Sequence, residues 1–170
     1  FVAIKGFETD GHRFIRKAME RGAVAVLCED APADGTPYIR IADCRLGLAY
    51  VSREFFGSPA KRMTLIGITG TSGKTTSSYL IKHMLETKLG AKVGLIGTNG
   101  NMIGDELAHS EHTTPESYEL NKLFAAMADA GCTHVVMEVS SHALALERVA
   151  GIHFDVGEFT NLSQDHLDLH

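Results

Sequence analysis

The sequence lacks any apolar stretch near the roughly 20 residues that a helix needs to cross a bilayer. It also lacks an excess of basic residues, because 21 Asp and Glu outnumber 16 Lys and Arg and the formal net charge is −5. Charges of both signs are mixed along the chain, so no basic stripe is present for nucleic acid or anionic lipid. We therefore expect neither a membrane nor a nucleic acid as a partner, and any phosphate must be held locally.

Cysteine is scarce as well. The three cysteines, Cys28, Cys44 and Cys132, are far apart and lie in or beside apolar runs. Their odd number and wide spacing favour buried free thiols over disulfides or a metal site. This predicts a protein of the reducing cytoplasm. No long apolar seam indicates an obligate dimer, so we expect a monomer.

The length of 170 residues and the hydrophobic content of 44% suit one core of good size or two small ones. A Gly57-Ser58-Pro59 turn breaks the pattern, which makes residues 57–62 a candidate linker between domains at 1–60 and 61–170. Phe1 opens directly in an apolar run and the other end falls in a polar segment. We expect both ends to be cut rather than natural.

Strand and helix patterns alternate along the chain, and the strands are apolar along their length, which predicts an α/β fold with a parallel sheet covered on both faces. Strands are expected at 1–4, 23–28, 38–41, 63–69, 92–97, 133–139 and 156–160. Helices are expected at 12–20, 45–56, 74–88, after Thr114-Pro115-Glu116, and at 143–149, with a long polar loop after residue 97. Polar clusters at 70–76, 138–142 and 161–166 follow three strands and should converge at one sheet edge.

The first cluster reads Gly70-Thr71-Ser72-Gly73-Lys74-Thr75-Thr76. Its glycines let backbone N–H groups turn toward phosphate oxygens, Lys74 supplies charge, and Thr75 can bind magnesium. It is a shortened P-loop, since Ile68 stands where the common pattern has its first glycine. The structural alternative is a glycine turn with an incidental surface lysine.

The second cluster places Glu138 at the end of an apolar strand, where a charge is costly to bury without a partner. A magnesium ion shared with Thr75 would be such a partner, and a cap on the following short helix is the alternative. In the third cluster, hard cations favour Asp165 or Asp168 over His166, and chemistry alone leaves the choice open. Thr113 and Thr114 have a sufficient structural explanation as a helix cap.

Taken together, these segments resemble the Mur ligase family. The resemblance to the family rests on the runs 67–76, 138–142 and 160–168. The similarity to its MurE branch rests on Phe1-Val2-Ala3-Ile4-Lys5-Gly6, Asp10-Gly11-His12 and Thr113-Thr114-Pro115-Glu116. That branch adds the third amino acid to UDP-MurNAc-L-Ala-D-Glu. The resemblance implies a small α/β UDP-binding domain followed by a P-loop-type ATP-binding domain, both incomplete.

The resemblance also implies roles for single residues. ATP would be held by Gly70, Thr71, Ser72, Gly73, Lys74, Thr75 and Thr76, and magnesium by Thr75, Glu138 and His166. The UDP-linked substrate would contact Phe7, Glu8, Thr9, Thr113, Thr114, Ser140 and Arg148, whereas Leu146 replaces a polar contact of some relatives. Lys74, Glu138 and His166 would be catalytic.

The implied reaction is amide-bond formation through an acyl phosphate, with UDP-MurNAc-L-Ala-D-Glu and free meso-diaminopimelate or L-lysine as substrates. The stretch before Phe1, the lysine that relatives carbamylate after His166, and the domain that selects the amino acid are absent. We therefore expect these 170 residues alone to bind nucleotide weakly and not to turn over.

Three alternatives remain. A folylpolyglutamate or cyanophycin synthetase shares this type of central domain but leaves the first 60 residues unexplained. A P-loop kinase or switch module usually holds magnesium with an aspartate. A silent regulatory homologue would not need Lys74, Thr75, Glu138 and His166 intact.

Overall fold

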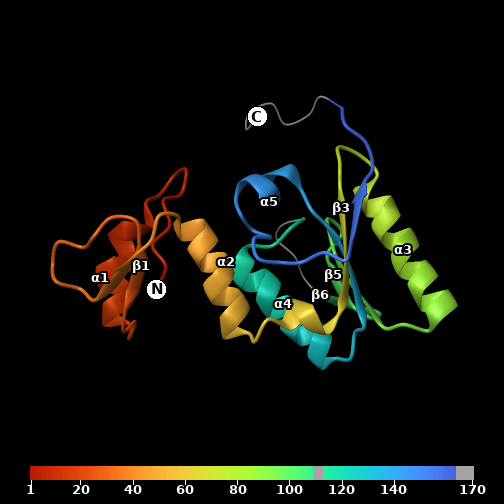
Figure 1. Cartoon of the computed structure of the whole chain (residues 1–170), viewed down its shortest axis with the longest axis horizontal. Coiled ribbons are helices and arrows are strands. Elements are labelled where there is room, and N and C mark those ends of the chain that lie inside the picture. The colour runs from red at the N-terminus through yellow and green to blue at the C-terminus, as the bar shows by residue number, and fades with distance from the viewer. Residues whose placement is uncertain (109–112, 164–170) are drawn as a thin grey trace.

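The structure is a computed structural model that describes residues 1–108 and 113–163. A smaller unit at the left of Figure 1 contains the 3-10 helix η1 (Gly11–Phe14), α1 (Ile15–Glu20) and a parallel pair of strands, β1 (Val26–Cys28) and β2 (Tyr38–Arg40). Its core is built from Ala3, Ile15, Val26 and Cys28. The strand expected at 1–4 is reduced to a bridge between Val2 and Leu27, because only this part of the segment lies alongside β1.

The larger unit is built on a six-stranded sheet in the order β6-β5-β4-β7-β3-β8. Four strands are parallel: β3 (Thr64–Thr69), β4 (Val93–Ile96), β7 (His134–Glu138) and β8 (Val156–Phe159). The predicted α/β class with a mainly parallel sheet is confirmed.

The prediction of a long polar loop after residue 97 is partly wrong. An antiparallel hairpin of β5 (Asn101–Ile103) and β6 (Glu106–Ala108) extends the sheet beyond β4. Its strands have three residues each, too few for an alternating pattern to be visible in the sequence. Gly104, with φ of 61°, makes the turn between them.

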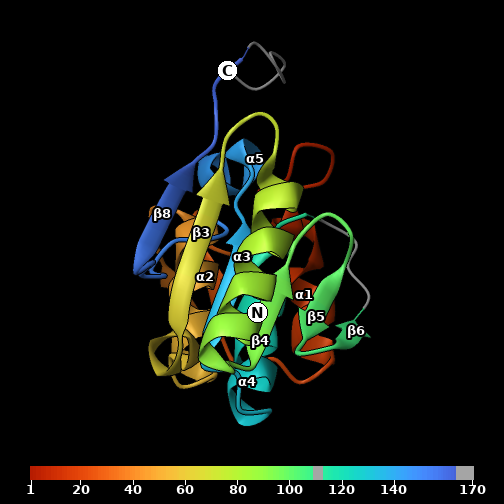
Figure 2. The same ribbon diagram turned by 90° about the vertical axis from the view of Figure 1, so that its right-hand side faces the viewer.

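Helices cover both faces of the sheet (Figures 1 and 2). On one face lies α3 (Lys74–Leu89), whose Ile81 and Leu85 pack on Ile66, Ile68, Val93, Leu95 and Val136. On the other lie α4 (Ser117–Asp129) and α5 (Ser141–Ala145), with Leu120, Phe124 and Met127 of α4 fully buried. A β-carbon at Gly94 would lie 2.5 Å from the Met127 sulfur, so glycine allows α4 to pack closely on β4.

The two units are joined by α2 (Cys44–Phe55) and the 3-10 helix η2 (Pro59–Arg62). Asp43 caps α2 through bonds from the backbone N–H groups of Arg45 and Leu46. Helix α2 packs against α4, and the Phe56 ring lies 5.3 Å from that of Tyr118. The segment 57–62 is thus a connection packed on the second unit.

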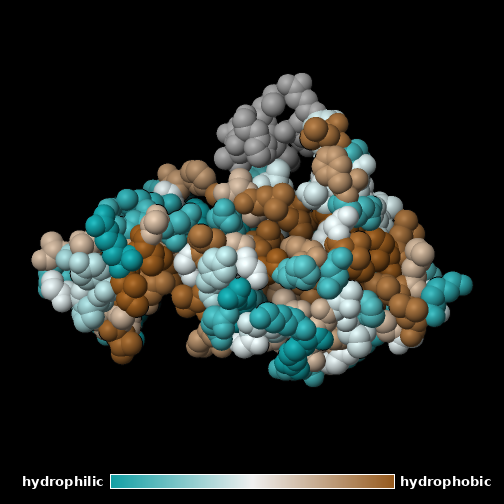
Figure 3. Space-filling view, viewed as in Figure 1, coloured by the Kyte–Doolittle hydropathy of each residue, from teal (hydrophilic) through white to brown (hydrophobic). Residues whose placement is uncertain are grey.

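Some large apolar side chains stay on the surface. Figure 3 shows hydrophobic side chains gathered over the region of α3 and β8, where Leu80, Met84, Val156 and Phe159 are all more than half exposed. No helix among the described residues is long and apolar enough to cross a membrane.

Candidate functional site

The glycine loop lies between the carboxyl end of β3 and the start of α3. Gly70 has a φ of 129° and Gly73 a φ of 87°, conformations that favour glycine. The Lys74 ammonium donates to the carbonyl oxygens of Gly70 (2.6 Å) and Thr71 (3.1 Å), so its charge lies over the loop. The loop and the helix start have the arrangement that the sequence predicts for a phosphate site.

The segment after β8 holds this loop in place. The Asn161 side chain accepts from the Ser72 N–H and donates to the Ser72 carbonyl, each at 3.0 Å. The Thr160 hydroxyl donates to the same carbonyl at 2.7 Å, and the Thr71 N–H donates to the Asn161 carbonyl. The third cluster therefore converges on the first, as predicted. His166, with Asp165 and Asp168, lies outside the described residues.

Glu138 ends β7 beside the loop and is 1% exposed. Its carboxylate accepts hydrogen bonds from the Thr75 hydroxyl (3.0 Å), the Thr98 N–H (3.1 Å) and the Thr98 hydroxyl (3.1 Å). Helix α5 is capped by the Ser140 hydroxyl instead. The alternative role of Glu138 as a helix cap is wrong, and the predicted approach of Glu138 to Thr75 is confirmed.

Thr98 is a site residue that the sequence analysis missed. A β-carbon at the preceding Gly97 would lie 2.3 Å from Glu138 Oε1, so the carboxylate packs directly against this turn. A signal was available, because Gly97-Thr98-Asn99-Gly100 follows the buried strand β4, and ligand sites lie at the carboxyl ends of parallel strands.

Thr114 does not cap α4. The helix begins after Glu116, which makes no capping side-chain bond, while the Thr114 hydroxyl donates to the Glu138 carbonyl (2.9 Å) and accepts from the Ser140 N–H (3.2 Å). The structural explanation of Thr114 as a helix cap is wrong, because this buried hydroxyl has partners on β7. These bonds bring Thr114 and Ser140 to the end of β7, and the Thr113 hydroxyl lies 3.1 Å from that of Thr98.

Arg148 belongs to the same neighbourhood. Its guanidinium donates to the Thr114 carbonyl at 3.0 Å and forms an ion pair with Glu116 at 2.6 Å. Its Nε is buried and has no hydrogen-bond partner among residues 1–108 and 113–163. Arg148 therefore supports the segment 114–116.

Phe7, Glu8 and Thr9 form an exposed loop on the smaller unit, and Phe7 is 79% exposed. Among residues 1–108 and 113–163, no hydrogen bond or ion pair joins this loop to Thr113, Thr114, Ser140 or Arg148. The Arg45 guanidinium lies 5.8 Å from the centre of the Phe7 ring. The structure thus leaves this loop apart from the site around Glu138.

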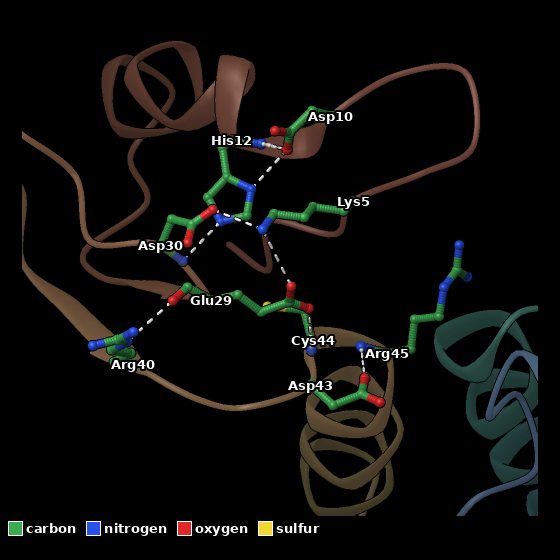
Figure 4. A network of polar contacts seen from close by, with 9 residues as sticks. All are labelled: Lys5, Asp10, His12, Glu29, Asp30, Arg40, Asp43, Cys44 and Arg45. Atoms are coloured by element: carbon green, nitrogen blue, oxygen red, sulfur yellow. Dashed lines mark hydrogen bonds and ion pairs between the residues drawn. The ribbon is translucent and has the colours of Figure 1, made fainter.

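A charged network supports the base of that loop (Figure 4). Asp10 accepts from the backbone N–H of His12 and contacts its ring at 2.7 Å, while Lys5 pairs with Asp30 at 2.7 Å. The His12 bonds hold the pKa of Asp10 below its ordinary value, and the Lys5 bond does the same for Asp30. The His12 ring has partners on both sides, because the Asp30 N–H also donates to its Nε2 at 3.4 Å.

Comparison with known proteins identifies the fold. The family model described as the Mur ligase middle domain matches residues 68–170, more than half of the chain. The model described as the Mur ligase family, catalytic domain, matches residues 1–57. The chain belongs to the Mur ligase family.

Among curated Mur ligases, the chain is 49% identical to the UDP-N-acetylmuramoyl-L-alanyl-D-glutamate–2,6-diaminopimelate ligase of Caldanaerobacter subterraneus subsp. tengcongensis, over all of its own length and 36% of the relative's. It is 47% identical to the ligase of the same name from Bacteroides fragilis, again over its whole length and 36% of that relative's. The chain spans about a third of these relatives.

Solved Mur ligase structures are similar too. One UDP-N-acetylmuramoyl-L-alanyl-D-glutamate–2,6-diaminopimelate ligase superimposes with a TM-score of 0.83 and 29% identity, covering 98% of this chain and 34% of its own. MurF from Thermotoga maritima, solved in complex with ADP, gives a TM-score of 0.51 and 26% identity over 83% of this chain and 29% of its own.

The residues of this Mur ligase chain fit a nucleotide with a divalent cation. Thr75 and Glu138 present a hydroxyl and a carboxylate 3.0 Å apart, the oxygen donors that magnesium prefers. No group of three His, Cys, Asp or Glu side chains that could hold a metal occurs in the described parts of the chain. Phosphate oxygens and water would therefore supply further ligands, as is usual for magnesium.

Proposed function

We propose that this chain is part of an ATP-dependent Mur ligase that adds meso-diaminopimelate or L-lysine to UDP-MurNAc-L-Ala-D-Glu. The observation that carries the proposal is the contact of Thr75 with the buried Glu138 at the mouth of the glycine loop. The Thr114 hydroxyl bonds the backbone carbonyl of Glu138 and the N–H of Ser140, which supports a role for both residues as substrate contacts near the nucleotide site. The name of the relatives supports this substrate.

In this proposal, Gly70, Thr71, Ser72, Gly73 and Thr76 surround the ATP phosphates, while the N–H groups of Thr71 and Ser72 stay bonded to Asn161 and fix the shape of the loop. Lys74 leaves the Gly70 and Thr71 carbonyls and places its charge on the phosphates. Thr75 and Glu138 hold magnesium, and His166 holds a second magnesium. Bound Mg–ATP would supply the transferring phosphoryl group and neutralise the negative charge that collects during transfer.

The glutamate carboxylate of the UDP-linked substrate would attack the γ-phosphorus and form an acyl phosphate, with ADP leaving. The amine of the incoming amino acid would then displace phosphate to form the amide. This chain orients the acceptor through Thr113, Thr114, Ser140 and Arg148, and fixed donors near the developing charge favour the transfer. No protein nucleophile takes part.

Phe7, Glu8 and Thr9 would lie against the uridine, far along the substrate from its reacting carboxylate. Their separation from the Glu138 site is consistent with an extended UDP-peptide that reaches across both units. We place the domain boundary at residues 60 and 61, and propose that the full-length protein is a cytoplasmic monomer.

The test is phosphate release by the full-length protein with Mg–ATP and UDP-MurNAc-L-Ala-D-Glu, with diaminopimelate or lysine added in turn. We expect phosphate release to require the UDP-dipeptide and one of the two amino acids. The amino acid that is required identifies the amine substrate. Release that is indifferent to the UDP-dipeptide would contradict the proposal and favour another ligase or a P-loop kinase.

A further inference from the structure

We propose that Thr98 is a positioning residue, which orients the Glu138 carboxylate for a divalent cation and connects it to the substrate-side hydroxyl of Thr113. The inference rests on the proposed function and adds to it a residue outside the P-loop. Thr98 lies in the turn after β4 and is exposed toward the site, whereas Glu138 is buried.

Two bonds from one residue orient the carboxylate. The Thr98 N–H donates to Glu138 Oε1 at 3.1 Å, and the Thr98 hydroxyl donates to Oε2 at 3.1 Å. Oε2 is also the oxygen that the Thr75 hydroxyl contacts. The backbone bond therefore anchors Oε1, and the hydroxyl of Thr98 acts on the oxygen that faces the proposed cation position.

The direction of the hydroxyl bonds follows from counting protons. A threonine hydroxyl has one proton to donate, and a carboxylate can only accept. Thr98 uses its proton on Glu138, so in the 3.1 Å contact between the hydroxyls of Thr98 and Thr113 it is Thr113 that donates. A directed chain runs from Thr113 through Thr98 to Glu138, and bonds in such chains strengthen one another.

Among the described residues, this sequence of hydrogen bonds leaves the lone pairs of Thr113 available to a donor on the substrate. A substrate group that donates a hydrogen bond to Thr113 would keep the Thr113 proton directed at Thr98. The Thr98 proton would then stay directed at Glu138. The nearby Thr114 reinforces the same connection, because it bonds the Glu138 carbonyl. Occupation of the substrate site and retention of the cation are therefore coupled through hydroxyl groups.

The experiment uses the full-length protein and four variants. Thr98→Val removes the hydroxyl at nearly constant shape, and Thr98→Ser keeps it. Thr113→Val interrupts the series of hydrogen bonds one step earlier, at Thr113. Thr87→Val is the matched control, because the bonds that the Thr87 hydroxyl makes within the described parts of the chain go to the His83 and Met84 backbone carbonyls of α3. Binding of a non-hydrolysable ATP analogue is measured by calorimetry while Mg²⁺ is titrated, and again without Mg²⁺.

Thr98→Val is expected to raise the Mg²⁺ concentration for half-maximal binding about tenfold, the loss of one hydrogen bond to a charged group, with unchanged affinity in the absence of Mg²⁺. Thr113→Val is expected to shift it in the same direction by less. Thr98→Ser and Thr87→Val should match the wild type. A merely structural role would alter the Mg²⁺-free affinity and the Tm instead.

Wild-type Mg²⁺ dependence in Thr98→Val would overturn the inference, as would a Thr98→Ser variant as impaired as Thr98→Val. If Thr98→Val does not fold, Thr113→Val decides, and an unchanged Mg²⁺ dependence there overturns the coupling. Failure of the wild-type protein to bind the analogue in a Mg²⁺-dependent way contradicts the proposed function itself. The two failures are thus distinguishable.

Discussion

At the scale of single residues, the charge of Lys74 lies on backbone carbonyls of its own loop. These carbonyls are neutral acceptors, and a phosphate oxygen is a stronger partner for an ammonium group because both are charged. The side chain can therefore exchange these partners for phosphate when nucleotide binds. The contact keeps the lysine in the site before the nucleotide arrives.

Replacement of Lys74 by methionine should reduce the kcat of ligation about 100-fold or more, because a positive group that stabilises transferring phosphate is removed. Phosphate release with both substrates measures it. Lys17→Met, on the exposed surface of the smaller unit, is the control and should keep wild-type activity. Retention of full kcat in Lys74→Met would exclude a catalytic role for the P-loop lysine.

The three thiols are buried, and burial raises the pKa of each, that of Cys44 from 9.0 to about 11. Because the thiolate is the reactive form, peptide mapping after iodoacetamide treatment at neutral pH should find Cys28, Cys44 and Cys132 unmodified in the native protein and modified in concentrated urea. Native labelling would contradict this burial.

The same shift has a consequence for stability. Below pH 9 the Cys44 thiol is neutral in both states, and between 9 and about 11 only the unfolded state ionises. The free energy of unfolding should therefore fall as the pH rises through this range. Urea midpoints across this interval measure the effect, and Cys44→Ala should show a smaller fall than the wild type.

At the scale of elements, α4 packs on one face of the sheet, and the proposed substrate residues Thr113 and Thr114 precede it in the chain. Leu120, Phe124 and Met127 are fully buried against strands, and the helix begins next to Thr114. Burial of these side chains fixes where the helix starts, and Thr114 then meets the end of β7. The packing of α4 thus places part of the site.

Truncation of Phe124 to alanine should lower the free energy of unfolding by about 3–5 kcal/mol, because a large buried ring is replaced by a cavity. Leu80→Ala is the matched control, since Leu80 is 58% exposed on α3 and should cost well under 1 kcal/mol. Urea unfolding of the two variants gives the comparison. Equal midpoints would show that α4 is not a core element.

At the scale of the whole molecule, the described sheet has an exposed edge at β8, with Val156 51% and Phe159 62% accessible. The chain spans about a third of its curated relatives, at 36% of their length. Among the described residues, no strand pairs with β8 on its outer side. About two thirds of the length of each of these relatives is not matched by the 170 residues.

We therefore expect residues 1–170 expressed alone to bind a fluorescent ATP analogue far more weakly than the full-length protein and to show no ligation. A titration of the analogue and the phosphate-release assay with both substrates measure the two properties. Turnover by these 170 residues would contradict the expectation and would require the amino acid to bind here. Lys74→Met in the same fragment is the control for non-specific nucleotide binding.

Local sequence patterns predicted much of the fold because the signals are short in range. Apolar runs predicted β3, β4 and β7, and the glycine loop was correctly expected between a strand and a helix. The short hairpin β5–β6 was missed because its stability comes from pairing with β4 rather than from its own residues. Helix capping was assigned wrongly at Thr114 because its partners are Glu138, the last residue of β7, and Ser140, two residues later.

Composition and periodicity by themselves determined the α/β class, the parallel sheet and the buried state of the cysteines, since hydrophobic burial follows residue type and spacing. Only the tertiary structure decided which polar groups meet. Glu138 joined Thr75 because β7 lies beside β3, and Thr98 joined Glu138 because β4 lies on the other side of β7. Hydrogen bonds depend on ångström distances between residues remote in sequence, and strand order, not local pattern, sets those distances.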